Sequence, residues 1–134
     1  MKSINQIQIT IENAKPRSAW NKCVQTYAFE LLADLETAIN DGYFSADALE
    51  DPKALEAQLL NGARDWSAYS WGGCSFIYDS DIAERLCTPS ELKKTRNGER
   101  RPKSREEWLD VQARALRQAA RHIIRAASGR VVIM

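Results

Sequence analysis

The chain has 134 residues, of which 44% are hydrophobic, and this is sufficient for one packed core in a single domain, residues 1–134. Its net charge of +1 hides an asymmetry: residues 1–92 hold 7 Lys/Arg and 14 Asp/Glu, whereas residues 93–134 hold 12 and 4. No apolar run is long enough to span a bilayer and the N-terminus has no apolar signal segment, so we expect a cytoplasmic protein without membrane partners.

The predicted fold is mainly α, a compact bundle of two long and several short helices. The first segment, Ile4–Ile11, is an exception, because Ile7, Ile9 and Ile11 alternate with polar residues at the period of a half-buried strand. The last segment, Val131–Met134, is also β-prone. A lone strand cannot satisfy its backbone groups, so we expect these N- and C-terminal segments to pair as a small two-stranded β element.

The first long helix is predicted from about Pro16 to Asn40, because apolar residues recur there at three- and four-residue spacing. Gly42 follows as a natural stop. The outer face of this helix is acidic and carries Glu30, Asp34 and Glu36.

Capping patterns predict the helices that follow. Ser45 caps a single turn over Ala46–Glu50, and Asp51-Pro52 opens a helix that reaches about Asn61. Ser104–Glu107 is a capping box that opens the second long helix. Gly129 marks the end of that helix.

Thr88–Glu91 is a further capping box and predicts a short helix that ends before Asn97-Gly98. With the segment before it, this region has features of a helix-turn-helix, in which Leu92 anchors the second helix. However, the spacing from Leu86 to Leu92 is one residue short, and Cys87 occupies the usual glycine position. An ordinary pair of short core helices is the alternative interpretation.

Basic residues dominate the last third of the chain, first in a loop and then on the final helix. Arg114, Arg117, Arg121 and Arg125 follow at spacings of three, four and four, which places them on one helix face. Guanidinium groups suit phosphate and carboxylate, so we expect a non-enzymatic binding protein for nucleic acid or a nucleoprotein. The predicted contact residues are Lys93, Lys94, Arg96, Arg100, Arg101, Lys103, Arg114, Arg117 and Arg121.

Two structural interpretations compete with this function. The arginines could form an ordinary solvated face, or they could pack on the acidic face of the first long helix in the same molecule. The pI of about 7.7 is also lower than is typical of a dedicated nucleic-acid-binding domain.

The segment Asp65–Asp79 concentrates five of the eleven aromatic residues of the chain around a Gly-Gly pair. Trp and Tyr anchor interfaces and stack on unpaired bases, but large aromatic side chains also plug cores. The predicted partner or ligand surface consists of Trp66, Tyr69, Trp71, Gly72, Gly73 and Cys74.

Catalytic and metal-binding patterns are weak. Cys74 and His122 could form a nucleophile and base pair, but nothing in their spacing supports contact. The three cysteines and the single histidine are too widely separated to form a zinc knuckle. We therefore expect no catalytic residue, no metal and no cofactor.

From Asn61 to Leu116 the chain resembles small proteins of unknown function encoded on mobile genetic elements of gut bacteria. The resemblance rests on Asp65-Trp-Ser-Ala-Tyr-Ser-Trp-Gly-Gly-Cys-Ser and on Ala83-Glu-Arg-Leu-Cys-Thr-Pro-Ser-Glu-Leu-Lys-Lys-Thr-Arg-Asn-Gly. It covers a little under half of the chain and carries no established activity, so it implies no functional residues.

The resemblance does imply an accessory protein that acts by binding. Such proteins regulate the DNA of the element or block host defence, as anti-CRISPR-like factors do. In the second case the target would be a host protein. It would be contacted by Glu30, Asp34 and Glu36 as a phosphate mimic, or by Trp66, Tyr69 and Trp71 as anchors.

Overall fold

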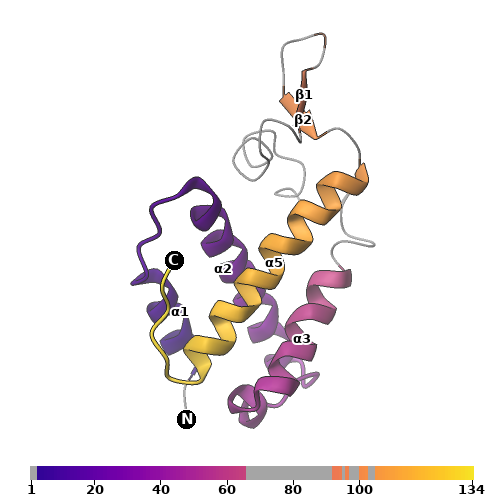
Figure 1. Cartoon of the computed structure of the whole chain (residues 1–134). Helices are drawn as coiled ribbons and strands as arrows, with labels where there is room; N and C mark the ends of the chain where they lie inside the picture. The colour runs from indigo at the N-terminus through magenta and orange to yellow at the C-terminus, as the bar shows by residue number, and fades with distance from the viewer. Residues whose placement is uncertain (1–2, 66–91, 95, 97–99, 103–104) are drawn as a thin grey trace.

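The computed structural model describes residues 3–65, 92–94, 96, 100–102 and 105–134, and these form a mainly helical bundle, as predicted (Figure 1). The long helix α5 crosses the bundle and contacts three other helices. The elements are α1 (Ile4–Glu12), α2 (Ala19–Asn40), the 3-10 helix η1 (Ala46–Glu50), α3 (Pro52–Asp65), β1 (Leu92–Lys94), β2 (Arg100–Pro102) and α5 (Arg105–Ala127).

The N-terminal segment is a helix, and its prediction as a strand is wrong. A capping box opens α1: the Gln6 N–H donates to Ser3 Oγ at 3.2 Å, and the Ser3 N–H donates to Gln6 Oε1 at 2.9 Å. Ile7 and Ile11, one helical turn apart, are fully buried, whereas Ile9 is 51% exposed. The helical spacing of Ile7 and Ile11 therefore decides the structure of this segment, and the alternation of Ile7, Ile9 and Ile11 does not.

The C-terminal segment is not a strand either. Val131–Met134 has no regular secondary structure. Val132 is buried in the core, and the segment runs beside α1, where it lines a shallow groove together with Thr10 (Figure 1). The two terminal segments are therefore neighbours, but the predicted β element between them is absent. The reason is that α1 satisfies its backbone groups within its own turns.

Both long helices end where their glycines predict. After α2, Gly42 has a φ of +82°, and the N–H of Tyr43 donates to the Ala38 carbonyl at 2.8 Å. After α5, Gly129 has a φ of +77°, and the N–H of Arg130 donates to the Arg125 carbonyl at 3.1 Å. Each is a Schellman motif, which reverses the chain and requires a left-handed residue. The start of α2 lies at Ala19 with Ser18 as N-cap, three residues after the predicted Pro16.

The short helices also follow their predicted caps. The Ser45 side chain accepts from the Asp47 N–H, and Asp51 Oδ1 accepts from the Lys53 N–H at 3.1 Å. Helix α3 begins at Pro52 as predicted and continues to Asp65, one turn beyond the predicted end.

The predicted short helix before Asn97 is wrong at Leu92–Lys94, which is strand β1, paired antiparallel with β2. The pairing sets Lys93 opposite Arg101 and Lys94 opposite Arg100. A helix of two turns is marginal in water, whereas an antiparallel partner supplies the backbone with hydrogen bonds. The second helix of a helix-turn-helix, which Leu92 would anchor, is therefore absent from these positions.

One apolar cluster joins α1, α2, η1, α3, α5 and the C-terminal segment. The face of α5 that it buries packs against α2 and α3. Among the fully buried side chains are Ile7, Ile11, Val24, Tyr27, Leu31, Leu32, Leu35, Leu55, Val111 and Ile123.

The capping box of α1 can be tested by mutation. Ser3→Ala removes the acceptor for the Gln6 N–H, so we expect a loss of about 1 kcal/mol in the free energy of unfolding, measured by urea denaturation. The exposed Asn5 on the same turn provides the control, because Asn5→Ala keeps the cap and improves helix propensity. Equal stability of Ser3→Ala and the parent protein would contradict the role of this cap.

Candidate anion-binding surface

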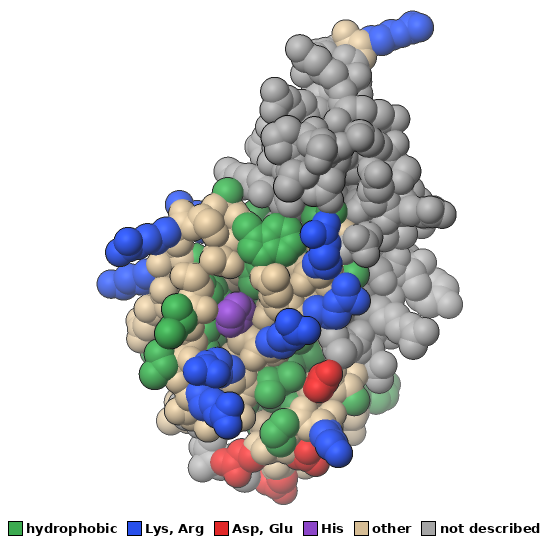
Figure 2. All heavy atoms as spheres, in the orientation of Figure 1, with side chains coloured by type: hydrophobic (Ala, Val, Ile, Leu, Met, Phe, Trp, Pro, Cys, Tyr) green, Lys and Arg blue, Asp and Glu red, His purple; other side chains and the backbone are tan. Residues whose placement is uncertain are grey.

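The four arginines predicted on one face of the last helix form an exposed row on α5, the arginine stripe: Arg114, Arg117, Arg121 and Arg125. At about 100° and 1.5 Å per residue, the stripe spans an arc of roughly 80° and a length of roughly 16 Å. Figure 2 shows basic side chains along the middle of this face, over α5, with acidic ones gathered at its lower end. The stripe is therefore a row of cations at the surface.

The stripe does not pair with the acidic face of α2 in the part of the chain that the structure describes. Helices α2 and α5 pack through apolar residues, while Glu30, Asp34 and Glu36 are exposed. Desolvation by neighbouring atoms and the negative charge of Glu30 raise the pKa of Asp34 to about 6. A neighbouring guanidinium would lower it. The raised pKa therefore argues against internal neutralisation.

The two ends of the stripe have structural partners. The Arg114 guanidinium lies 6.0 Å from the ring centroid of Trp20, and Trp20 Nε1 donates to Gln118 Oε1 at 2.7 Å. At the other end, Arg125 Nε donates to the Val131 carbonyl oxygen. These contacts fix both ends of the stripe to the body of the protein.

The middle of the stripe is different. Arg117 and Arg121 make no hydrogen bond or ion pair with the residues that the structure describes. Repulsion between like charges at four-residue spacing destabilises a helix. Two exposed guanidiniums at this spacing are therefore well placed to receive an external anion.

His122 lies beside the stripe on α5 and is half-buried. Its pKa is lowered, first by desolvation and then by the positive charge of Arg125. The imidazole is therefore neutral at neutral pH, and the charge of the stripe comes from arginine. Cys74, the proposed partner of His122 in catalysis, lies outside the described residues. Among the residues that are described, no three Asp, Glu, His or Cys side chains gather as metal ligands.

A groove of about 480 Å³ runs between the second half of α5 and the beginning of α3. Three members of the stripe line one wall, namely Arg117, Arg121 and Arg125, and Arg130 also lines the groove. Glu56 of α3 is the single acidic residue of the lining. We call this feature the arginine groove. Its four cations and one anion give it a net charge of +3.

Strands β1 and β2 form a hairpin, which extends the basic region beyond the N-terminal end of α5 (Figure 1). The predicted contact residues Lys93, Lys94, Arg100 and Arg101 lie on its two strands, and Arg96, between the strands, is exposed. The register sets cations directly opposite one another, which is unfavourable for a hairpin on its own. The hairpin and its turn carry Lys93, Lys94, Arg96, Arg100 and Arg101, the stripe carries Arg114, Arg117 and Arg121, and Lys103 lies outside the described residues.

The predicted aromatic surface also lies outside the described residues. This holds for every residue assigned to it, so both its role as a partner surface and its role as a core plug remain predictions. The residues concerned are Trp66, Tyr69, Trp71, Gly72, Gly73 and Cys74.

Sequence reasoning missed Arg130 and Glu56 as members of the site. Arg130 follows the stop glycine of α5, and the pattern of Gly129 predicts a chain reversal that returns Arg130 towards the helix. That signal was present in the sequence. Glu56 lies on a different helix, and only the packing of α3 against α5 brings it to the groove.

No protein family model, curated protein or solved structure shows significant similarity to this chain. None of the helices in the described part of the chain is both long enough and apolar enough to cross a membrane. The resemblance to proteins of mobile genetic elements stays a prediction.

The raised pKa of Asp34 predicts a pH-dependent effect on stability. Protonation is favoured in the folded state, so the contribution of Asp34 to stability is fully present below pH 3.8 and is lost as the pH rises through about 6. We therefore expect Asp34→Asn to stabilise the protein at pH 8, by at most about 1 kcal/mol for this solvent-screened position. The gain should shrink on acidification.

Urea denaturation at a series of pH values measures this effect. Glu36→Gln is the matched control, because it removes an exposed acid of the same helix and changes the net charge equally. A stabilisation by Asp34→Asn that is independent of pH would contradict the titration of Asp34.

Proposed function

We propose that this protein is a non-enzymatic nucleic-acid-binding protein whose arginine stripe contacts the phosphate backbone. The observation that carries the proposal is the middle of the stripe. Arg117 and Arg121 are exposed, point away from the core and have no partner among the described residues. Anions close to these guanidiniums would relieve their mutual repulsion and form charge-assisted hydrogen bonds.

The dimensions of the stripe fit a nucleic-acid strand. Its length of roughly 16 Å corresponds to the axial rise of about five phosphates on one strand of a duplex. The guanidinium group of arginine can donate two parallel hydrogen bonds to one phosphate. A row of four such groups therefore matches a row of phosphates.

The hairpin enlarges the same surface. In the register of the two strands Lys93 is paired with Arg101 and Lys94 with Arg100, and β2 contacts α5. A polyanion that reaches the hairpin would offset the cost of these like-charge pairs. We infer that the hairpin contributes further phosphate contacts at one end of the stripe.

The proposed contacts are to phosphate, so binding should tolerate changes of sequence. Phosphate contacts fix position and orientation, whereas specificity needs contacts to base edges. A role in binding nucleic acid also fits the accessory function that the resemblance to mobile-element proteins implies.

A fluorescence anisotropy titration over a range of salt concentrations tests the proposal. Four phosphate contacts by the stripe predict a slope of log K against log salt of about −3.6 for duplex DNA and about −2.8 for single strands. Contacts from the hairpin would steepen both slopes. Absence of binding to duplex DNA, single-stranded DNA and RNA at low salt would reject the function.

A further inference from the structure

The arginine groove differs from the rest of the stripe in shape and composition. Arg114 lies outside the groove, but from Arg117 to Arg125 helix α3 forms a second wall beside the stripe. Pro52, Ala120 and Ile124 add an apolar lining between the charged groups. A volume of about 480 Å³ lies within the usual range of small-ligand sites, roughly 300–1,000 Å³. The groove can therefore hold a compact ligand with a charged and an apolar part.

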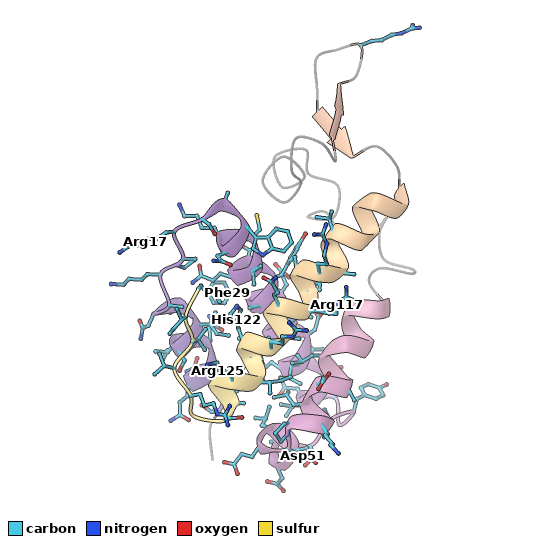
Figure 3. The ribbon with its side chains drawn as sticks, viewed as in Figure 1. Arg17, Phe29, Asp51, Arg117, His122 and Arg125 are labelled. Atoms are coloured by element: carbon cyan, nitrogen blue, oxygen red, sulfur yellow. The ribbon has the colours of Figure 1, made fainter. Side chains whose placement is uncertain are left out.

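The end of α5 places a fourth cation in this groove. The Schellman turn at Gly129 reverses the chain, and the Arg130 N–H donates to the Arg125 carbonyl. The Nε of Arg125 in turn donates to the carbonyl of Val131, so the helix end and the following segment hold each other. Figure 3 shows Arg117 and Arg125 extending from α5, with Asp51 at the beginning of α3. The Arg125 side chain and the Arg130 backbone are thus held in place before any ligand arrives.

The charged groups of the arginine groove form no ion pairs with one another among the described residues. Glu56 lines the same groove as four arginines, but no ion pair joins it to any of them among the described residues. Of the N–H donors on the four guanidiniums, the single hydrogen bond within the described part is that of Arg125 Nε. The groove therefore keeps both donors and an acceptor for a ligand that lies between its walls.

The beginning of α3 does not supply the anion site. The carboxylate of Asp51 already accepts hydrogen bonds from the N–H groups of Lys53 and Ala54. This cap places a negative charge at the helix N-terminus. Anion binding in the groove is therefore a property of the arginines.

We propose that the arginine groove binds the triphosphate group of a nucleotide, with Arg117, Arg121, Arg125 and Arg130 on the phosphates. The base would lie on Ile124 and Pro52, and Glu56 would accept a hydrogen bond from a hydroxyl or amino group of the nucleoside. Four arginines that line one groove suit several charges on one ligand, whereas each internal phosphate of a strand carries one. The inference rests on the proposed function, because Arg117, Arg121 and Arg125 belong to both the arginine groove and the arginine stripe.

Two kinds of ligand carry such a triphosphate group: a free nucleoside triphosphate and the 5′-triphosphate end of an RNA strand. The experiment measures binding of ATP against adenosine, and of a 5′-triphosphorylated RNA against the 5′-hydroxyl RNA of the same sequence. We expect a preference of at least about tenfold for the triphosphate in one or both pairs, since a single good charge-assisted contact accounts for that factor. The pair that carries the preference identifies the source.

Arg130→Gln separates this inference from the proposed function, because Arg130 lines the groove but is not part of the stripe. It should remove most of the triphosphate preference, which is measured as the ratio of the two affinities within each ligand pair and is therefore independent of any general loss of RNA affinity. Arg17→Gln is the charge-matched control, since Arg17 is exposed on the segment before α2 and points away from α5 (Figure 3).

The possible failures are distinguishable. Equal binding within each ligand pair overturns the groove inference and leaves the proposed function intact. A triphosphate preference that survives Arg130→Gln also overturns it. Binding of ATP without binding of any RNA or DNA strand would instead reject the proposed function and keep the groove.

Discussion

The double variant Arg117→Gln and Arg121→Gln should bind nucleic acid about 100-fold more weakly than the parent protein at low salt, because each lost charge-assisted contact costs roughly tenfold. Both residues are exposed and make no hydrogen bond or ion pair with the described part of the chain. Their replacement should therefore leave folding intact. Glutamine keeps the length and polarity of the side chain and removes the charge.

The salt dependence gives a second and sharper measurement. Removal of two phosphate contacts should reduce the magnitude of the salt slope by about 1 per arginine. The control is again Arg17→Gln, paired with Lys22→Gln, since these exposed cations lie outside the stripe and the double change has the same effect on net charge. If both double variants weaken binding equally, the arginine stripe is not the contact surface and the overall charge of the protein explains the affinity.

Ile123→Ala should have the largest effect on stability, a loss of about 2–4 kcal/mol in the free energy of unfolding. Ile123 is fully buried on α5, the helix that packs against α1, α2 and α3. The truncation removes apolar contact area and leaves a cavity that rigid neighbours fill only in part. This is a large share of the roughly 5–15 kcal/mol that is typical of a folded domain.

Ile133→Ala is the matched control, because it is the same substitution at a side chain that is 78% exposed. It should change stability by less than about 0.5 kcal/mol. Urea denaturation of both variants measures the difference. A loss below about 1 kcal/mol for Ile123→Ala would contradict its position in a close-packed core.

Local signals in the sequence predict most of the helices, because caps and stops depend on nearest neighbours. Gly42 and Gly129 both stand at positive φ after the helices that they were predicted to end. Asp51-Pro52 opens α3 as expected. The position of the arginine stripe on one face of α5 follows from spacing alone, since the face is set by the helical period.

The errors arose where two local patterns competed. In α1 the alternation of isoleucines favoured a strand, but Ser3 and Gln6 form a capping box and the isoleucines four residues apart are the buried ones. Around Leu92 a capping box favoured a helix, whereas pairing with Arg100–Pro102 makes a strand. Such pairing is a property of two segments and is invisible to a single short window.

In the candidate site, too, local spacing predicts some features, whereas packing between helices decides the others. The exposure of Arg117 and Arg121 depends on which face α5 turns to α2, and only packing decides that. Glu56 joins the groove because α3 lies beside α5. Charge counting alone left open whether the acidic and basic halves of the chain neutralise each other.

The central place of α5 has a consequence for synthesis of the protein. Helices α1, α2 and α3 leave the ribosome first, but each packs against α5, which is made more than a hundred residues after α1 begins. The parts of their apolar faces that contact α5 therefore stay uncovered until α5 emerges from the exit tunnel. Contacts this distant along the chain delay folding, and exposed apolar surface promotes association in the meantime. Burial of this surface is thus complete only after α5 has been made.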